Sequence, residues 1–173
     1  DPEAFNRCFV AWTQSLVGST EGKMVAIDGK TLRGSGDAAA GRSPRHLVSA
    51  WVGENQIVFG QVATAAKSNE ITAIPELLKL LDLKGATLTI DAMGCQRRIV
   101  EEVMAKQADY IIAVKDNQPK RSEAIGALVV KHLEGELEAL KHRNYETNER
   151  GHGRRDERLY FVAQVPPDFA AKD

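Results

Sequence analysis

The chain has 173 residues, of which 43% are hydrophobic and 27% are charged, and its formal net charge is −1 at pH 7. These values are typical of a globular domain with its own core, and they exclude a protein that binds nucleic acid through overall positive charge. No apolar run is long enough to span a membrane and no signal peptide is visible, so no membrane partner is expected. The two cysteines, Cys8 and Cys95, provide no disulfide framework and favour a reducing cytoplasm.

The first 22 residues are predicted to be a leading helix and a linker. The chain does not begin with Met, which leads us to expect a piece of a longer protein. Apolar residues recur at helical spacing over residues 2–17, which predicts a packing helix. The residues of that face are Phe5, Cys8, Phe9, Trp12 and Leu16.

Three predicted strands follow the linker. Residues 24–28 are an apolar run that ends in Asp28, and residues 31–44 are a glycine-rich, basic loop. Residues 46–52 and 56–63 are separated by a short turn, which predicts an antiparallel hairpin. The first three strands are therefore expected to form an antiparallel meander.

Helices and strands alternate after the meander. A helix is predicted to start at Ser68–Glu70, where capping residues precede an apolar periodicity, and another covers residues 96–107. Between them, residues 86–91 form a strand that ends in Asp91. The run at residues 110–114 lacks polar alternation, which predicts a buried central parallel strand.

The remaining chain is predicted to be more polar. Residues 124–140 read as a third helix and residues 145–158 as a polar, basic stretch. Residues 159–165 read as a last strand. Residues 145–173 are interpreted as the start of a β-rich insertion.

The order β-β-β-α-β-α-β-α predicts an α/β fold, a mixed sheet of a three-stranded antiparallel meander plus parallel strands, with flanking helices. That order matches the ribonuclease H-like fold, in which the first and fourth strands lie side by side and parallel. Asp28 and Asp91 would then be neighbours at one edge of the sheet. We treat residues 1–173 as a single domain of this type.

Two neighbouring carboxylates at strand ends favour a divalent metal site for phosphodiester chemistry. The ion relieves the repulsion between the two charges and binds phosphate oxygens as well. The alternative is that each aspartate only caps the turn after its strand, which aspartate often does. The pattern by itself leaves both interpretations open.

Five motifs carry a resemblance to a known family. They are residues 25–33 (VAIDGKTLR), 67–78 (KSNEITAIPELL), 89–96 (TIDAMGCQ), 110–118 (YIIAVKDNQ) and 152–154 (HGR). In this order they resemble the bacterial insertion-sequence transposases of the DDE class, specifically the group of H-repeat-associated proteins. The resemblance extends over nearly the whole chain.

The resemblance implies a ribonuclease H-like catalytic domain, Mg²⁺ or Mn²⁺ as cofactor, and double-stranded DNA, both transposon ends and target, as partner. By motif, Asp28 and Asp91 correspond to the first two catalytic, metal-binding acids. It also implies a bacterial cytoplasmic, nucleoid-associated protein and a possible homo-oligomer of the full-length chain.

The third acid of the class is a glutamate that we place in a downstream Trp-x-Val/Ile-Glu-Asn motif, which this sequence lacks. We therefore expect a partial catalytic domain that is inactive alone. Asp156 and Glu157 are the alternative metal ligands within the chain. They are also flanked by arginines, so an ion-pair role is the competing interpretation.

Several polar residues are candidate DNA contacts, each with a plain structural alternative. Lys30 and Arg33 follow Asp28 and either hold phosphates or belong to a solvated loop. Lys115, Asn117 and Gln118 leave a parallel strand at the same edge and either bind substrate or cap a turn. The densest basic cluster suits a DNA backbone but is equally compatible with a solvated surface. It comprises Arg150, His152, Arg154, Arg155 and Arg158.

Three functions compete on this evidence. The first is metal-dependent strand cleavage and strand transfer during transposition and DNA recombination. The second is a catalytically incomplete remnant that lacks the third acidic residue but still folds and binds DNA. The third is a structure-specific nuclease on the same fold, which the motif set disfavours.

Overall fold

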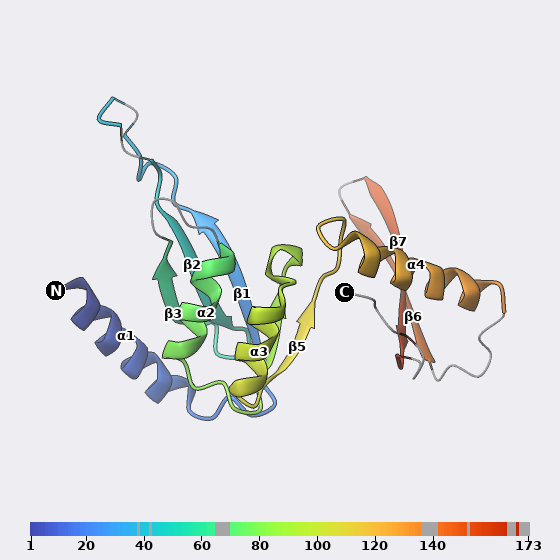
Figure 1. The fold of residues 1–173 in the computed structure, drawn as a ribbon, viewed down its shortest axis with the longest axis horizontal. Helices are drawn as coiled ribbons and strands as arrows, with labels where there is room; N and C mark the ends of the chain where they lie inside the picture. Colours follow the sequence, from blue (N-terminus) through green and yellow to red (C-terminus); the bar gives the residue numbers. More distant parts are fainter. Residues whose placement is uncertain are drawn as a thin grey trace. The chain divides into compact units, whose positions relative to one another are not determined.

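We analysed a computed structural model of the chain, which describes residues 1–37, 39–41, 43–64, 70–135, 142–151, 153–165 and 169. The chain forms two compact units, residues 1–117 and residues 118–173 (Figure 1). The first unit contains a five-stranded sheet, and the second contains a helix and a two-stranded hairpin.

Three antiparallel strands open the sheet of the first unit. They are β1 (Met24–Thr31), β2 (His46–Val52) and β3 (Ile57–Ala63). β2 pairs with β1 on one side and with β3 on the other, which confirms the predicted meander. β1 runs past Asp28 into the predicted loop, because Lys30 and Thr31 continue the ladder opposite Leu47 and His46.

Two parallel strands complete the sheet in the order β3-β2-β1-β4-β5. β4 (Thr87–Ile90) pairs in parallel with β1, and β5 (Asp109–Ile112) pairs in parallel with β4. The register places Ile27 of β1 opposite Ile90 of β4. The first and fourth strands are thus parallel neighbours, as the element order predicts.

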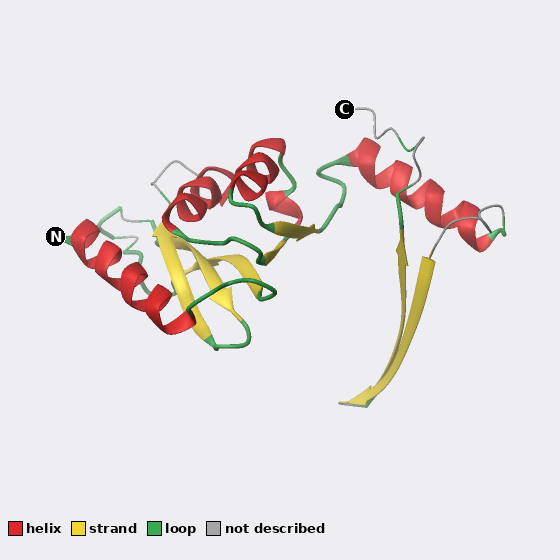
Figure 2. Cartoon of the chain, turned by 90° about the horizontal axis from the view of Figure 1, so that it is seen from below, coloured by secondary structure: helices red, strands yellow, loops and turns green. Residues whose placement is uncertain are grey.

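Helices α2 (Glu70–Leu80) and α3 (Arg97–Ala105) lie together on one face of the sheet (Figure 2). Their apolar faces enter the core through Ala73, Ile74, Leu77 and Leu78 of α2 and Ile99 and Val103 of α3. Each fully buried aliphatic side chain contributes about 1.5–3 kcal/mol of hydrophobic stabilisation. The predicted capping residues Ser68 and Asn69 lie outside the described residues.

The leading helix α1 (Pro2–Val17) is present as predicted, but its predicted packing face is wrong. Phe5 is 72% exposed and Trp12 is 59% exposed. The buried face instead carries Val10, Thr13 and Val17. Thr13 decides the orientation, since its hydroxyl donates to the Phe59 carbonyl of β3 at 2.8 Å. Apolar spacing in the sequence cannot identify a polar residue that faces the core because it donates a hydrogen bond to a carbonyl of the edge strand β3.

The position predicted for β5 is also wrong. Among the residues that the structure describes, β5 pairs with β4 alone and lies at the edge of the five-stranded sheet. Tyr110 is 45% exposed and Ile111 is 59% exposed, whereas Ile112 packs against the core. An apolar run indicates which faces can be buried, but it does not determine whether a strand has neighbours on both sides.

The second unit contains α4 (Pro119–Leu133), β6 (His142–Gly151) and β7 (Arg154–Ala163). α4 begins at a proline, which suits the first helical turn, and so starts earlier than the predicted 124–140. Residues 136–140 of that prediction lie outside the described residues.

The stretch at 145–158, read as merely polar, belongs largely to the antiparallel hairpin β6–β7. The predicted strand at residues 159–165 corresponds to the second half of β7, whereas β6 and the first half of β7 were missed because their polar and charged residues do not alternate with apolar ones.

A mixed five-stranded sheet with flanking helices is an α/β arrangement of the ribonuclease H-like type, as predicted. Within the described part of the chain, no helix combines the length and apolar character needed to cross a membrane.

Candidate functional site

The parallel pairing of β1 and β4 brings two aspartates to neighbouring positions, toward the carboxyl ends of these two internal strands. Asp28 directly follows Ile27, and Asp91 directly follows Ile90, its register partner. Both strand ends are anchored by buried apolar side chains, because Ile27 and Ile90 are each 5% exposed. The two aspartates themselves are exposed, so their carboxylates are accessible to solvent and to a substrate.

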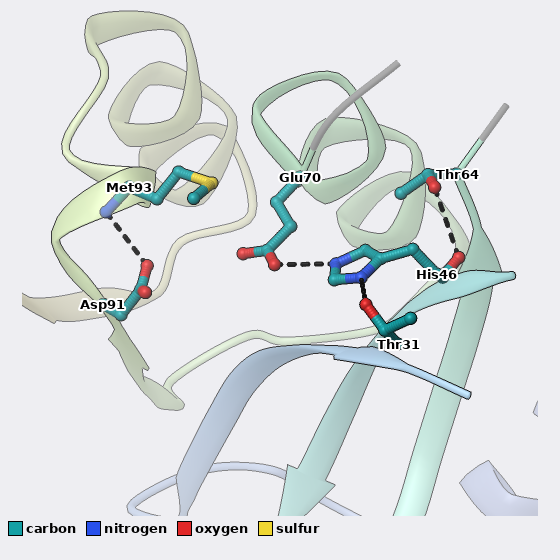
Figure 3. A network of polar contacts seen from close by, with 6 residues as sticks. All are labelled: Thr31, His46, Thr64, Glu70, Asp91 and Met93. Atoms are coloured by element: carbon teal, nitrogen blue, oxygen red, sulfur yellow. Dashed lines mark hydrogen bonds and ion pairs between the residues drawn. The ribbon is translucent and has the colours of Figure 1, made fainter. Parts of the chain in front are cut away.

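Asp91 also caps the turn that follows β4. One carboxylate oxygen, Oδ1, accepts the backbone N–H of Met93 at 3.0 Å, and Asp91 is the N-cap of the short 3₁₀ helix η1 (Ala92–Gly94) (Figure 3). The capping role and a metal-binding role are compatible, since the cap uses one oxygen and orients the carboxylate. Capping was the alternative left open by the sequence, and it holds for Asp91.

Gly94 keeps this turn close to the end of β4. A Cβ at Gly94 would overlap Cγ2 of Ile90, so the turn can lie this close to the strand only with glycine there. Ile90 is branched at Cβ and has little rotamer freedom to move away. The position of Asp91 therefore depends on the glycine three residues later.

A polar network that sequence analysis did not identify lies beside Gly29, the residue after Asp28, and is drawn in Figure 3. His46 Nε2 lies 2.7 Å from Glu70 Oε1, and His46 Nδ1 lies 2.9 Å from Thr31 Oγ1. The carboxyl group of Glu70 packs against Gly29, where a Cβ would overlap it. Sequence analysis assigned no role to His46 and used Glu70 only as a helix-start signal.

The candidate DNA contacts in the first unit divide into two kinds. Lys30, Arg33 and Lys115 are exposed. The side chain of Asn117 instead donates from Nδ2 to the Ala92 carbonyl at 2.5 Å. This bond joins the segment after β5 to the turn after Asp91, which is the structural alternative considered for Asn117.

The remaining candidates lie in the second unit. Gln118 precedes α4 as its N-cap without a side-chain capping bond, and Arg154 and Arg155 are on β7. An open hollow of about 520 Å³ at the hairpin tip is lined by Arg150, Gly151, Gly153, Arg154 and Arg155. His152 lies outside the described residues.

The two acids considered as alternative metal ligands are engaged with arginines on the hairpin. Arg155 Nη2 lies 2.7 Å from Glu157 Oε1, and Arg158 Nη2 lies 3.8 Å from Asp156 Oδ2. Both pairs are about half exposed and so contribute little stability. These contacts match the ion-pair interpretation of the two acids.

The chemistry of the strand-end donors fits a hard divalent cation, because Mg²⁺ and Mn²⁺ bind carboxylate oxygens. The donor set is small, however. Among the residues that the structure describes, no three His, Cys, Asp or Glu side chains are close enough to hold one ion. Asp28 and Asp91 are the two carboxylates that the β1–β4 register brings to neighbouring positions of the sheet.

Comparison with known proteins identifies the family. Residues 19–165 match the family described as "Transposase DDE domain". The chain belongs to this family. Both strand-end aspartates lie within the matched residues, as do all the strands of both sheets. No solved structure matches the chain.

Individual relatives of this DDE domain carry consistent names. The chain is 47% identical to "Putative transposase YncI" of Escherichia coli O157:H7 over 169 aligned residues. The aligned region covers 98% of this chain and 43% of that protein. It is 46% identical to "Putative transposase YncI" of strain K12, over 98% of this chain and 67% of that protein. It is 42% identical to "H repeat-associated putative transposase YhhI" of strain K12, over 97% of this chain and 44% of that protein. The chain thus spans from under half to about two thirds of the length of these relatives.

Proposed function

We propose that this DDE domain carries the first two acids of a transposase catalytic centre, in which Asp28 and Asp91 hold Mg²⁺ or Mn²⁺. The single observation that supports this most directly is the parallel pairing of β1 and β4, with both aspartates immediately after the register pair Ile27 and Ile90. Two carboxylates fixed in this way form a site for an oxygen-binding cation.

The cation would polarise a phosphodiester oxygen and stabilise charge during cleavage and strand transfer. The residues of the chain do the positioning. Asp28 presents its carboxylate from within β1, directly after the buried Ile27, and the hydrogen bond from the Met93 backbone N–H orients the carboxylate of Asp91. Lys30 and Arg33 continue from Asp28 as exposed cations that hold DNA phosphates beside the site.

We place the third acid of the centre outside these 173 residues. The ion pairs of Asp156 and Glu157 with hairpin arginines support this placement. The full-length protein would then cut and join double-stranded DNA in the bacterial cytoplasm, with transposon ends and target as substrates. The hairpin arginines and Lys115, Asn117 and Gln118 would contribute DNA contacts.

The test is Mg²⁺-dependent strand cleavage by the full-length protein on DNA that carries the ends of its element. Asp28→Asn and Asp91→Asn are each expected to lower cleavage by about a thousandfold or more, because each removes a charged ligand from a two-carboxylate site. Glu76→Gln is the control, since Glu76 is an exposed partner of Lys79 on α2. Cleavage at the wild-type rate by either aspartate variant would refute the proposal.

A second candidate is a remnant that folds and binds DNA without cutting it. The observation in its favour is that the described residues contain no group of three potential metal ligands. A gel shift of DNA that weakens with salt, with no Mg²⁺-dependent nicking by the full-length protein, would support the remnant over the enzyme.

A further inference from the structure

A further acidic side chain, that of Glu70, lies next to the residue that follows Asp28. The proposed catalytic centre gives this side chain no role. Glu70 is the first residue of α2, and its side chain is only 14% exposed. Its carboxyl group packs against the backbone of Gly29, the residue after Asp28. A Cβ at Gly29 would overlap both this carboxyl group and Nε2 of His46. The absence of a side chain at residue 29 is therefore what admits the carboxylate.

His46 fixes the carboxylate from the other side. His46 Nε2 lies 2.7 Å from Glu70 Oε1, where the carboxylate can only accept, and His46 Nδ1 lies 2.9 Å from the Thr31 hydroxyl oxygen. These two contacts hold the imidazole ring between Thr31 and Glu70 and so fix the position of the Glu70 carboxyl group.

The second carboxylate oxygen of Glu70 points away from His46. In Figure 3, this oxygen lies on the side of Asp91. The structure thus holds one oxygen of a largely buried carboxylate on a histidine and leaves the other on the side of Asp91.

We propose that Glu70 is an additional acidic group of the metal site, admitted by Gly29 and positioned by His46, that strengthens divalent cation binding through its charge. The proposal rests on the proposed function, since it requires a cation at Asp28 and Asp91. Glu70 acts here through charge rather than as a ligand, because the described residues contain no three groups close enough to share one ion. A carboxylate shielded from solvent interacts more strongly with a nearby cation than an exposed one does.

The rival explanation is that the His46–Glu70 pair only fastens α2 to β2. The substitution Glu70→Gln distinguishes the two explanations. Glutamine has nearly the same shape as glutamate, and its carbonyl oxygen accepts the same hydrogen bond from His46. A purely structural pair would tolerate this change, whereas a charge acting on the cation would be lost.

The experiment is a Mn²⁺ titration of the whole 173-residue chain, followed by electron paramagnetic resonance of the free ion. Glu70→Gln is expected to weaken Mn²⁺ binding by about fivefold or more, as the loss of one nearby charge requires. Glu76→Gln is the matched control, on the same helix but exposed, and is expected to bind as the wild type does. Thermal unfolding followed by the fluorescence of Trp12 and Trp51 checks that each variant is folded.

Gly29→Ala provides a second, independent test, which also applies if Glu70→Gln does not fold. The added methyl group displaces the ends of the Glu70 and His46 side chains, so Mn²⁺ binding is expected to weaken as well. Where both variants fold, the double variant is expected to bind no more weakly than Glu70→Gln alone, because both changes act through one carboxylate.

Asp28→Asn distinguishes failure of the inference from failure of the proposed function. If Asp28→Asn loses Mn²⁺ binding while Glu70→Gln and Gly29→Ala bind as the wild type does, Glu70 has no part in the site but the metal centre stands. If Asp28→Asn binds Mn²⁺ as the wild type does, the metal centre itself is refuted and the inference with it.

Discussion

Acidic residues occur at two places that sequence alone made candidates for metal binding, the β1–β4 edge and the β6–β7 hairpin. At the edge, Asp28 and Asp91 follow strands whose side chains are buried in the core. On the hairpin, Asp156 and Glu157 lie on exposed strands and contact Arg158 and Arg155. The acidic residues of the first unit therefore follow residues that are buried in the core, whereas those of the hairpin contact neighbouring arginines.

The comparison indicates what makes a carboxylate a candidate metal ligand. A buried strand fixes the backbone beneath the carboxylate, and the parallel register sets its neighbour. On the hairpin, Asp156 and Glu157 instead contact arginines two residues away on the same strand, β7. The core of the first unit, rather than the number of acids nearby, makes the edge the better site.

The largest expected contrast concerns two leucines. Leu88 of β4 is fully buried, whereas Leu159 of β7 is 66% exposed. Leu88→Ala is expected to lower the free energy of unfolding by about 2–5 kcal/mol, through lost burial and a cavity. Leu159→Ala is expected to change it by no more than about 0.5 kcal/mol. Urea denaturation followed by circular dichroism measures both, and equal losses would mean that the hairpin is packed as tightly as the sheet.

Replacing either of two glycines by alanine is expected to change stability in opposite directions. Gly94→Ala forces a methyl group onto Cγ2 of Ile90 and is expected to destabilise the first unit by about 1–3 kcal/mol. Gly126 lies in α4 with open space around it, so Gly126→Ala is expected to stabilise that helix by about 0.5–1 kcal/mol. Both tryptophans belong to the first unit, so their fluorescence should follow the Gly94 change alone. A stabilising Gly94→Ala would show that the turn after Asp91 is not held close to β4.

Two asparagines test the smaller polar contacts. Asn117→Ala removes the bond to the Ala92 carbonyl and is expected to cost about 1 kcal/mol in the first unit. Asn148→Ala removes exposed hairpin bonds to Arg155 and Glu157 and is expected to cost less than about 0.5 kcal/mol. Urea unfolding of the two variants measured side by side checks the order. A larger loss of unfolding free energy for Asn148→Ala than for Asn117→Ala would mean that the polar contacts of the hairpin stabilise the protein more than this contact of the first unit does.

The smallest stability effect is expected for the arginines of the hairpin tip. Arg154→Gln is expected to leave the free energy of unfolding within about 0.5 kcal/mol of the wild type, because the side chain is exposed. If Arg154 contacts a DNA phosphate, the slope of log affinity against log salt should fall by about 0.9. Titration of labelled duplex DNA at several salt concentrations measures this slope, and an unchanged slope would exclude Arg154 from the DNA interface.

Sequence reasoning was enough for the order of helices and strands in the first unit, for the antiparallel meander and, through the match to the ribonuclease H-like fold, for the parallel placement of β1 beside β4. These follow from apolar periodicity, turn residues and the short list of allowed sheet connections, all of which are local or topological. Asp28 and Asp91 were chosen on the same basis, since each ends an apolar run, and the motifs around them indicated the transposase family.

Which faces are covered and which polar groups meet depends on contacts between segments that are distant in the sequence. The buried face of α1 depends on a threonine that bonds to a carbonyl of β3, and β5 is an edge strand because no further strand pairs with it among the described residues. The contact of Glu70 with His46 and Gly29 joins residues from three elements, so no local pattern predicts it. Periodicity records what a segment can bury, whereas burial and polar contact depend on neighbours that are distant in the sequence.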